Sequence, residues 1–332
     1  MKKYLIVILI LIISMQSKSQ EIHFSQFFAA PLFLSPSFAG TTPGSRVNIN
    51  FRDQWPGVPG NFITSAVSYD HNFKNFNTGL GFLLTADRAG EGDLSTINAG
   101  LVYSYDVKIN YKWNFRPGIN FQYARRGIDV NKLFSSQEVV QADGSYTHRG
   151  SINYPTLKSI GYIDMAVSSA MFSDDAWFGV TVDHLLMPNQ ALSNEADSKI
   201  PVKYVGFAGY QFVNRYNKHL RRLENVSSAL MFKYQGQNSQ LSLGFYWTRT
   251  PITLGVWDRG IPLIKSLKEH DALVFLFGFA KNDIRVGYSY DFTLSSLVGQ
   301  TGGSHEISIS YLFNKVIINK EPKHRIVPCP DI

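Results

Sequence analysis

Residues 97–105 read Ile97-Asn98-Ala99-Gly100-Leu101-Val102-Tyr103-Ser104-Tyr105, and residues 306–313 read Glu306-Ile307-Ser308-Ile309-Ser310-Tyr311-Leu312-Phe313. In both stretches apolar residues alternate with small or polar ones, and aromatic residues gather toward one end. Successive side chains of a β-strand point to opposite faces, so each stretch has one apolar and one polar face. This pattern is typical of a strand closed into a barrel within a lipid bilayer. A large soluble β-sandwich or barrel is the competing interpretation.

The same alternation recurs along the chain, with almost no helix-like segment after residue 20, and predicts fourteen strands. An even number is what single-chain bacterial outer-membrane barrels have. The expected strands are 45–53, 61–71, 77–86, 94–107, 111–124, 161–171, 175–184, 202–213, 225–235, 239–249, 252–258, 272–280, 284–291 and 304–313.

Short and long connections between these strands largely alternate. An outer-membrane barrel has this pattern, because its periplasmic turns are short and its external loops are long. Two connections break the rule: Gly236–Asn238 is short where a loop is expected, and Asn214–Glu224 is long where a turn is expected. A soluble sandwich has no reason to alternate in this way. The sequence therefore predicts an all-β protein whose residues 45–313 form a closed antiparallel transmembrane barrel.

The first expected strand shows which residues face lipid. Its alternation sends Val47, Ile49 and Phe51 outward and Asn48, Asn50 and Arg52 into the lumen. An arginine on the lipid face at mid-depth costs about 2–4 kcal/mol, so apolar and charged residues favour the same register. Pro117 lies inside the fifth expected strand. A proline there is tolerated only at a bulge or strand edge because it lacks a ladder donor.

Residues 1–19 have the pattern of a secretory signal peptide. Lys2 and Lys3 precede the apolar run Leu5–Ile13, and cleavage before Gln20 is expected. The chain is then exported to the outer membrane as a barrel, because open sheets cannot satisfy their backbone groups in lipid. Its formal charge of +7 falls to +4 without the three signal-peptide lysines, which is too weak and scattered to indicate nucleic-acid binding. Cys329, the single cysteine, is a free thiol or an intermolecular partner.

Residues 20–44 form a second distinct segment, rich in apolar residues and interrupted by Pro31 and Pro36. The segment is too apolar for a disordered tail and too irregular for a strand. We expect it to plug the lumen or cross the periplasmic mouth, with a strap on the barrel rim as the alternative. The residues expected to make this contact are His23, Phe24, Phe27, Phe28, Phe33 and Phe38.

The sequence does not bring together the residues that an enzyme or a metal site needs. Asp183-His184 and His305-Glu306 invite a catalytic interpretation, but no nucleophile is placed beside them. The eight histidines are dispersed, and residues 87–93 lack the spacing of a calcium loop. We therefore expect no catalytic residues, no metal and no cofactor.

Several separated motifs resemble one family. They are His23-Phe24-Ser25-Gln26-Phe27, Phe51-Arg52-Asp53-Gln54-Trp55, Gly287-Tyr288-Ser289-Tyr290-Asp291 and Gly302-Gly303-Ser304-His305-Glu306. Together they resemble PorP/SprF proteins over nearly the whole mature chain. The resemblance implies a non-enzymatic outer-membrane component of the type IX secretion system of Bacteroidota, in the setting of gliding motility or adhesin display. It implies as partners a secreted adhesin or its C-terminal secretion domain, and periplasmic ring and lipoprotein components.

Two groups of residues are candidates for partner binding. Apolar residues in expected external loops would contact the secreted partner, and basic residues in the connection 214–224 would dock periplasmic machinery. The tail 314–332 would also lie in the periplasm, and the barrel wall would contact outer-membrane lipid. A fatty-acid-porin (FadL-like) transporter of hydrophobic small molecules is the alternative function. The apolar candidates are Leu185, Leu186, Met187, Ile261, Leu263, Leu294 and Leu297, and the basic ones are Arg215, Lys218, Arg221 and Arg222.

Overall fold

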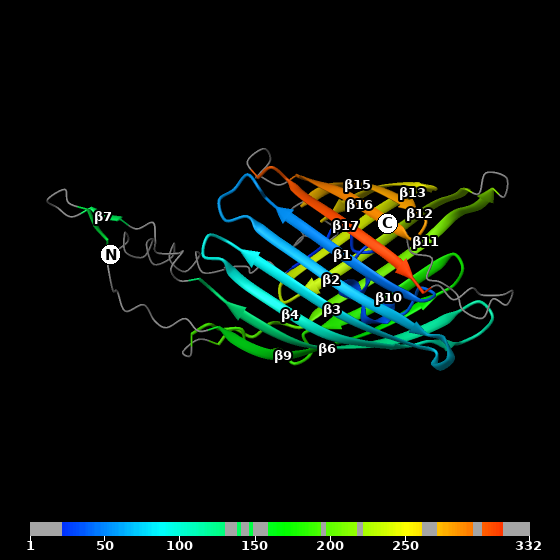
Figure 1. The fold of residues 1–332 in the computed structure, drawn as a ribbon, viewed down its shortest axis with the longest axis horizontal. Coiled ribbons are helices and arrows are strands. Elements are labelled where there is room, and N and C mark those ends of the chain that lie inside the picture. The colour runs from blue at the N-terminus through cyan, green and yellow to red at the C-terminus, as the bar shows by residue number, and fades with distance from the viewer. Residues whose placement is uncertain are drawn as a thin grey trace, which may run out of the picture.

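The computed structural model is a β-barrel with its strands strongly tilted (Figure 1). It describes residues 22–129, 138–140, 146–148, 159–193, 197–217, 222–260, 271–294 and 301–314. Residues 1–19, which are predicted to be a signal peptide, and residues 315–332 of the C-terminal tail lie outside the described residues. Over the described ranges, no helix has both the length and the apolar character needed to cross a membrane.

Fourteen antiparallel strands form the ring, and all fourteen expected strands are present. Their bounds differ from the sequence prediction by a few residues at most ends. The ring strands are β1 (Ser45–Gln54), β2 (Phe62–Phe73), β3 (Thr78–Ala89), β4 (Leu94–Tyr105), β6 (Asn114–Gly127), β9 (Ile160–Phe172), β10 (Ala176–Asp183), β11 (Lys203–Asn217), β12 (Arg222–Gln235), β13 (Asn238–Arg249), β14 (Ile252–Arg259), β15 (Ala272–Lys281), β16 (Ile284–Thr293) and β17 (Ser304–Phe313).

The ring closes where the first and last strands meet. β1 pairs with β17 from Ser45↔Phe313 to Gln54↔Ser304, and β4 pairs with β6. The two-residue strand β5 (Val107–Lys108) adds to β6 as a fifteenth strand. β7 (Glu138–Val140) and β8 (Tyr146–His148) form a separate two-stranded sheet. The predicted closed antiparallel barrel is confirmed.

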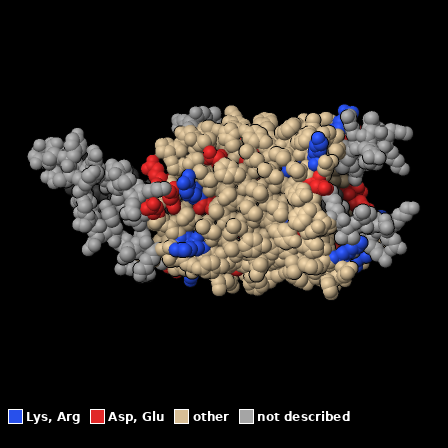
Figure 2. Space-filling model, viewed as in Figure 1, with Lys and Arg blue, Asp and Glu red and all other residues tan. Residues whose placement is uncertain are grey.

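The side chains face as the alternation predicts. Ile49 and Phe51 are 46% and 44% exposed on the outer wall, whereas the intervening Asn50 is only 2% exposed and points inward. Leu101 of β4 is 68% exposed. In Figure 2 uncharged residues occupy the middle of the visible face, and the charged residues lie toward its two ends. This is the outer surface that a bilayer requires.

The two ends of the barrel differ in their connections. The four longest connections, 128–159, 184–202, 260–271 and 294–303, all lie at one end, which we call the long-loop end. The opposite, short-turn end includes the connections 173–175, 250–251 and 282–283. The prediction of a long connection over residues 214–224 is wrong. β11 and β12 extend past their predicted ends and leave only residues 218–221 between them. The connection 236–237 at the long-loop end is short, as its sequence indicates.

Pro117 lies where one ladder is interrupted. On one side its Cα pairs with Ser169 of β9. On the other side the partner strand breaks, since Ser104 of β4 pairs with Gly118 and pairing resumes only at Val107 with Phe115. The missing donor of the proline therefore coincides with an irregularity, as the sequence predicts.

Candidate functional site: the N-terminal segment and the long-loop mouth

Residues 22–44 run between the two ends of the barrel among inward-facing side chains. At the short-turn end, the amide of Gly40 donates to Asp70 Oδ2 at 2.8 Å, and Ser104 Oγ donates to the Ala39 carbonyl at 2.7 Å. At the long-loop end, the amides of Ser25 and Gln26 donate to the Glu306 carboxylate at 2.7 and 3.0 Å. The segment is therefore fixed at both ends by bonds from its own backbone.

Two short helical turns shape the segment between these ends. They are α2 (Pro31–Leu34) and η1 (Pro36–Phe38), and each begins with a proline. Proline suits the first helical position because its fixed φ matches the helix and its missing N–H has no partner there anyway. The prolines that exclude a strand in this segment thus start its two turns.

The segment approaches the wall most closely near Gly79 of β3. A Cβ at Gly79 would overlap the carbonyl oxygen of Ala39. Beside this contact, Arg46 Nε bonds to Asp70 Oδ1 at 2.9 Å, and Arg46 Nη2 donates to the Phe38 carbonyl at 3.2 Å. The backbone of the segment and the wall are in direct contact here.

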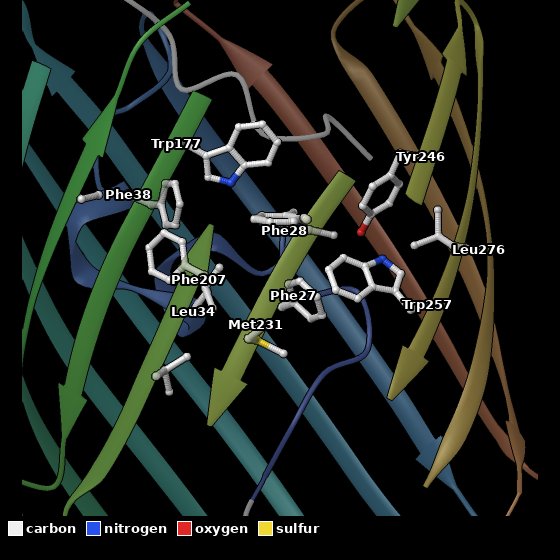
Figure 3. Close-up of a cluster of buried hydrophobic side chains, with 14 of the residues drawn as sticks. Phe27, Phe28, Leu34, Phe38, Trp177, Phe207, Met231, Tyr246, Trp257 and Leu276 are labelled. Carbon is white, nitrogen blue, oxygen red and sulfur yellow. The ribbon is translucent and has the colours of Figure 1, made fainter. Parts of the chain in front are cut away.

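Aromatic packing holds the middle of the segment (Figure 3). The Phe27 ring meets the Trp257 ring edge-on with centroids 4.5 Å apart, and Phe28 lies 5.9 Å from Trp177 and 6.3 Å from Tyr246. Trp257, Trp177 and Tyr246 come from β14, β10 and β13. Burying a phenylalanine stabilises by about 1.5–3 kcal/mol, so this cluster contributes strongly to the position of the segment.

The other expected contact residues of the segment also face inward-pointing groups. Phe24 packs edge-on against Phe33 at 5.1 Å, and Phe38 lies 5.4 Å from Phe207. Phe24, Phe27, Phe28 and Phe38 are buried, whereas His23 and Phe33 are half-buried.

An ion cluster anchors the segment near the long-loop end. Arg52 is 1% exposed and bonds to Asp291 at 2.8 Å and to Glu306 at 3.2 Å. Arg259 bonds to Asp291 at 2.8 Å. The hydroxyl of Ser25 donates to Asp291 at 2.7 Å and accepts from Arg52 and Arg259 at 2.8 Å each. Four strands and the segment thus meet in one network.

Sequence reasoning did not single out Arg259, Asp291 and Glu306 as this network. Each occupies an inward-facing position of an alternating strand, so the sequence does predict that its side chain points into the barrel. Their meeting depends on the curvature of the ring, which no local pattern encodes. They come from β14, β16 and β17.

Two cavities lie near the long-loop end, and Ile22 lines both of them. The first has a volume of about 350 Å³, an apolar floor that includes Phe24, Phe27 and Met231, and a polar rim that includes Lys203 and Asp271. The second has a volume of about 340 Å³ and is lined mainly by polar side chains. Both are within the size range of small-molecule sites.

The protein-family model that describes the type IX secretion system membrane proteins PorP/SprF matches residues 16–311 of this chain. This chain belongs to the PorP/SprF family. The family resemblance drawn from the four motifs is therefore confirmed. No curated protein matches the chain.

Solved structures similar to this PorP/SprF protein include an outer membrane protein and two toluene transporters. The toluene transporter TbuX of Ralstonia pickettii is 10% identical, with a TM-score of 0.51 over 86% of this chain and 94% of that one. Omp33 of Acinetobacter baumannii is 7% identical, with a TM-score of 0.46 over 82% of this chain and 100% of that one. TodX of P. putida is 11% identical, with a TM-score of 0.45 over 84% and 92%. At these identities the likeness concerns the fold alone.

The structure separates the apolar partner-binding candidates. Leu186 and Met187 are exposed in the connection after β10, with Leu185 half-buried beside them, and Leu294 is exposed after β16. Five strands lie between β10 and β16 in the ring, so the described candidates do not form one patch. Ile261, Leu263 and Leu297 lie outside the described residues.

The basic candidates belong to strand ends rather than to a loop. Arg215 lies in β11 and Arg222 in β12, at the short-turn end. Lys218 and Arg221 lie outside the described residues. The docking role of all four stays a prediction.

The two residue pairs that invite a catalytic interpretation are split by the fold. Asp183 forms an ion pair with Lys203 at 3.0 Å, whereas His184 bonds to Asp164. Glu306 points into the ion cluster, and His305 bonds to Tyr288 on the opposite face of β17 at 2.8 Å. The described ranges contain no group of three or more His, Cys, Asp or Glu side chains that could hold a metal ion.

Proposed function

We propose that this PorP/SprF protein is a non-enzymatic outer-membrane barrel that helps export a secreted adhesin or holds it at the cell surface. Family membership carries the proposal, because it assigns the chain to the type IX secretion system. The barrel geometry supports a holding role. Bonds of residues 22–44 to inward-facing side chains near both ends of the barrel support a plug in the lumen. In this proposal a folded partner binds the rim instead of passing through.

The long-loop end faces the outside in this proposal, as long loops do in outer-membrane barrels. Exposed Leu186 and Met187 lie there and supply apolar contact surface for the secreted partner. Exposed apolar groups of this kind often mark interfaces. The short-turn end, with Arg215 and Arg222, would face the periplasmic ring and lipoprotein components, and so would residues 314–332.

The test is affinity purification of a tagged chain from native outer membranes, followed by mass spectrometry. We expect a large adhesin to co-purify with the wild type and to be lost from Leu186→Glu/Met187→Glu. Asn75→Glu, an exposed change at the short-turn end, is the matched control and keeps the adhesin. Recovery of the barrel without any secretion-system protein contradicts the proposal.

Transport of hydrophobic small molecules is the second candidate, favoured by the apolar floor of the 350 Å³ cavity. A lateral exit for such molecules would lie at Pro117, where β6 stays paired with β9 but its ladder on the β4 side is interrupted. Purified barrel that carries bound lipid and lacks protein partners would favour transport over adhesin display.

A further inference from the structure

The second cavity at the long-loop end has a lining suited to a polar ligand. It occupies about 340 Å³ and is lined by strands β3, β4, β6, β9, β12 and β13 and the connection after β10. The side chains that define it are Asp87, Asn98, Gln122, Arg126, Asp164 and His184. The neighbouring cavity has an apolar floor, so the two differ in the chemistry they offer.

Hydrogen bonds hold these polar side chains in fixed positions. Asp164 is fully buried, and its Oδ2 accepts from Gln122 Nε2 at 3.4 Å and bonds to the ring of His184. Its Oδ1 accepts from the Met165 amide at 2.8 Å. Arg126 donates to Gln190, and Asn98 donates to Thr85 at 3.0 Å. Side chains held in this way form a preorganised lining, which reduces the entropy lost when a ligand binds.

Asn120 supplies an independent observation beneath this lining. It is 5% exposed, and its Oδ1 accepts no hydrogen bond from the described residues. Asn120 lines a cavity of about 60 Å³ that shares Asn98, Gln122 and His184 with the larger one. A buried acceptor without a donor is unfavourable by about 1–3 kcal/mol, so a ligand hydroxyl reaching it would bind well.

The charges of the lining balance. The lining contains two carboxylates, Asp87 and Asp164, and two cations, Arg126 and Lys199, so it favours neither an anion nor a cation. Amide, hydroxyl and imidazole groups add both donors and acceptors. Tyr162 contributes an aromatic ring to the same cavity. This combination matches a neutral molecule that carries many hydroxyl groups.

We propose that the polar cavity is a binding site for a neutral carbohydrate of one or two sugar units. The site lies at the end of the barrel that we place outside the cell, but it does not depend on the adhesin assignment. An apolar ligand would favour the neighbouring cavity, and a charged ligand would leave one sign of charge in this cavity uncompensated.

The experiment uses the full mature chain in lipid nanodiscs prepared without sugar-based detergent. Saturation-transfer NMR and calorimetric titration are performed with glucose, galactose, mannose, N-acetylglucosamine, lactose and maltose. We expect at least one of them to bind. Thr96→Trp, which fills the polar cavity, should weaken that binding at least about tenfold, equivalent to about 1.4 kcal/mol.

Ser239→Trp is the matched control, because Ser239 lines the first cavity and not the second. It should leave the affinity for the sugar unchanged. Gln122→Leu removes one hydrogen-bonding side chain without adding bulk, and should weaken binding in the same direction if Thr96→Trp fails to fold. The proposal is overturned if none of the six sugars binds, if neither cavity variant weakens binding, or if glucuronate binds more tightly than glucose.

Discussion

At the residue scale, Arg52 decides how the N-terminal segment is held. It is almost fully buried, and its guanidinium contacts Asp291, Glu306 and Ser25. Removing one partner of a buried ion network leaves an uncompensated charge, which is more costly than losing an exposed pair. The alternation of β1 predicts the inward direction of Arg52, but it does not predict its partners.

Arg52→Met tests this network. We expect the free energy of unfolding to fall by about 3–5 kcal/mol, measured by urea titration in lipid vesicles. Arg88→Met is the control, since Arg88 pairs with Asp93 at 3.5 Å while 48% exposed, and should cost at most about 1 kcal/mol. Arg52→Met/Glu306→Gln should recover part of the loss. Equal effects of Arg52→Met and Arg88→Met would contradict a coupled buried cluster.

Gly79 gives a second test at the residue scale. Gly79→Ala places a Cβ against the Ala39 backbone, which cannot retreat easily because the amide of Gly40 is bonded to Asp70. Overpacking of this kind destabilises by about 1–3 kcal/mol. Gly206→Ala is the matched control, because no atom lies within 4 Å of its added Cβ. Thermal unfolding should separate the two variants, and an unchanged midpoint for Gly79→Ala would refute the close contact.

At the element scale, each strand is defined by its two faces. Shifting a strand by one residue moves its apolar side chains to the opposite face, so the pattern fixes the register as well as the fold. β4 shows this clearly, since Leu101 points to lipid while Val102 and Ser104 point inward. The alternation predicts the ends of strands less well than their faces. β11 and β12, for example, extend beyond the ends that the sequence predicts.

A charge on the lipid face tests the assignment of faces. Leu101→Arg places a cation near the middle of β4, where we expect a loss of about 2–4 kcal/mol in the free energy of unfolding in vesicles. Leu101→Phe, which keeps the face apolar, should be nearly neutral. If Leu101→Arg folds as stably in lipid as Leu101→Phe, the outer wall is not the membrane-facing surface.

At the scale of the whole molecule, the segment 22–44 lies inside the ring of strands. It contacts strands on several sides of the ring, including β6, β10, β14 and β17. A fourteen-stranded ring without such a segment leaves room for water in its lumen. We propose that this segment, which lies outside every ring strand, closes the lumen.

Deletion of residues 22–38 should open the barrel. In planar bilayers we expect the shortened chain to conduct ions and the intact mature chain to remain nearly silent. A chain that lacks residues 315–332 serves as the control and should behave as the intact one. Similar conductance of the deletion variant and the intact chain, with both shown to be folded by heat-modifiable mobility, would exclude a plugging role.

The sequence by itself determined the strand pattern, the direction of side chains such as Ile49 and Asn50, and the family. These properties are local or linear, because a period of two and a motif are written along the chain. The tertiary structure alone decided that Arg52, Arg259, Asp291 and Glu306 meet at Ser25, and that polar side chains of six strands line one cavity. Closure of the ring brings together residues more than two hundred positions apart in the chain. A local sequence pattern contains no information about which of such distant residues will meet.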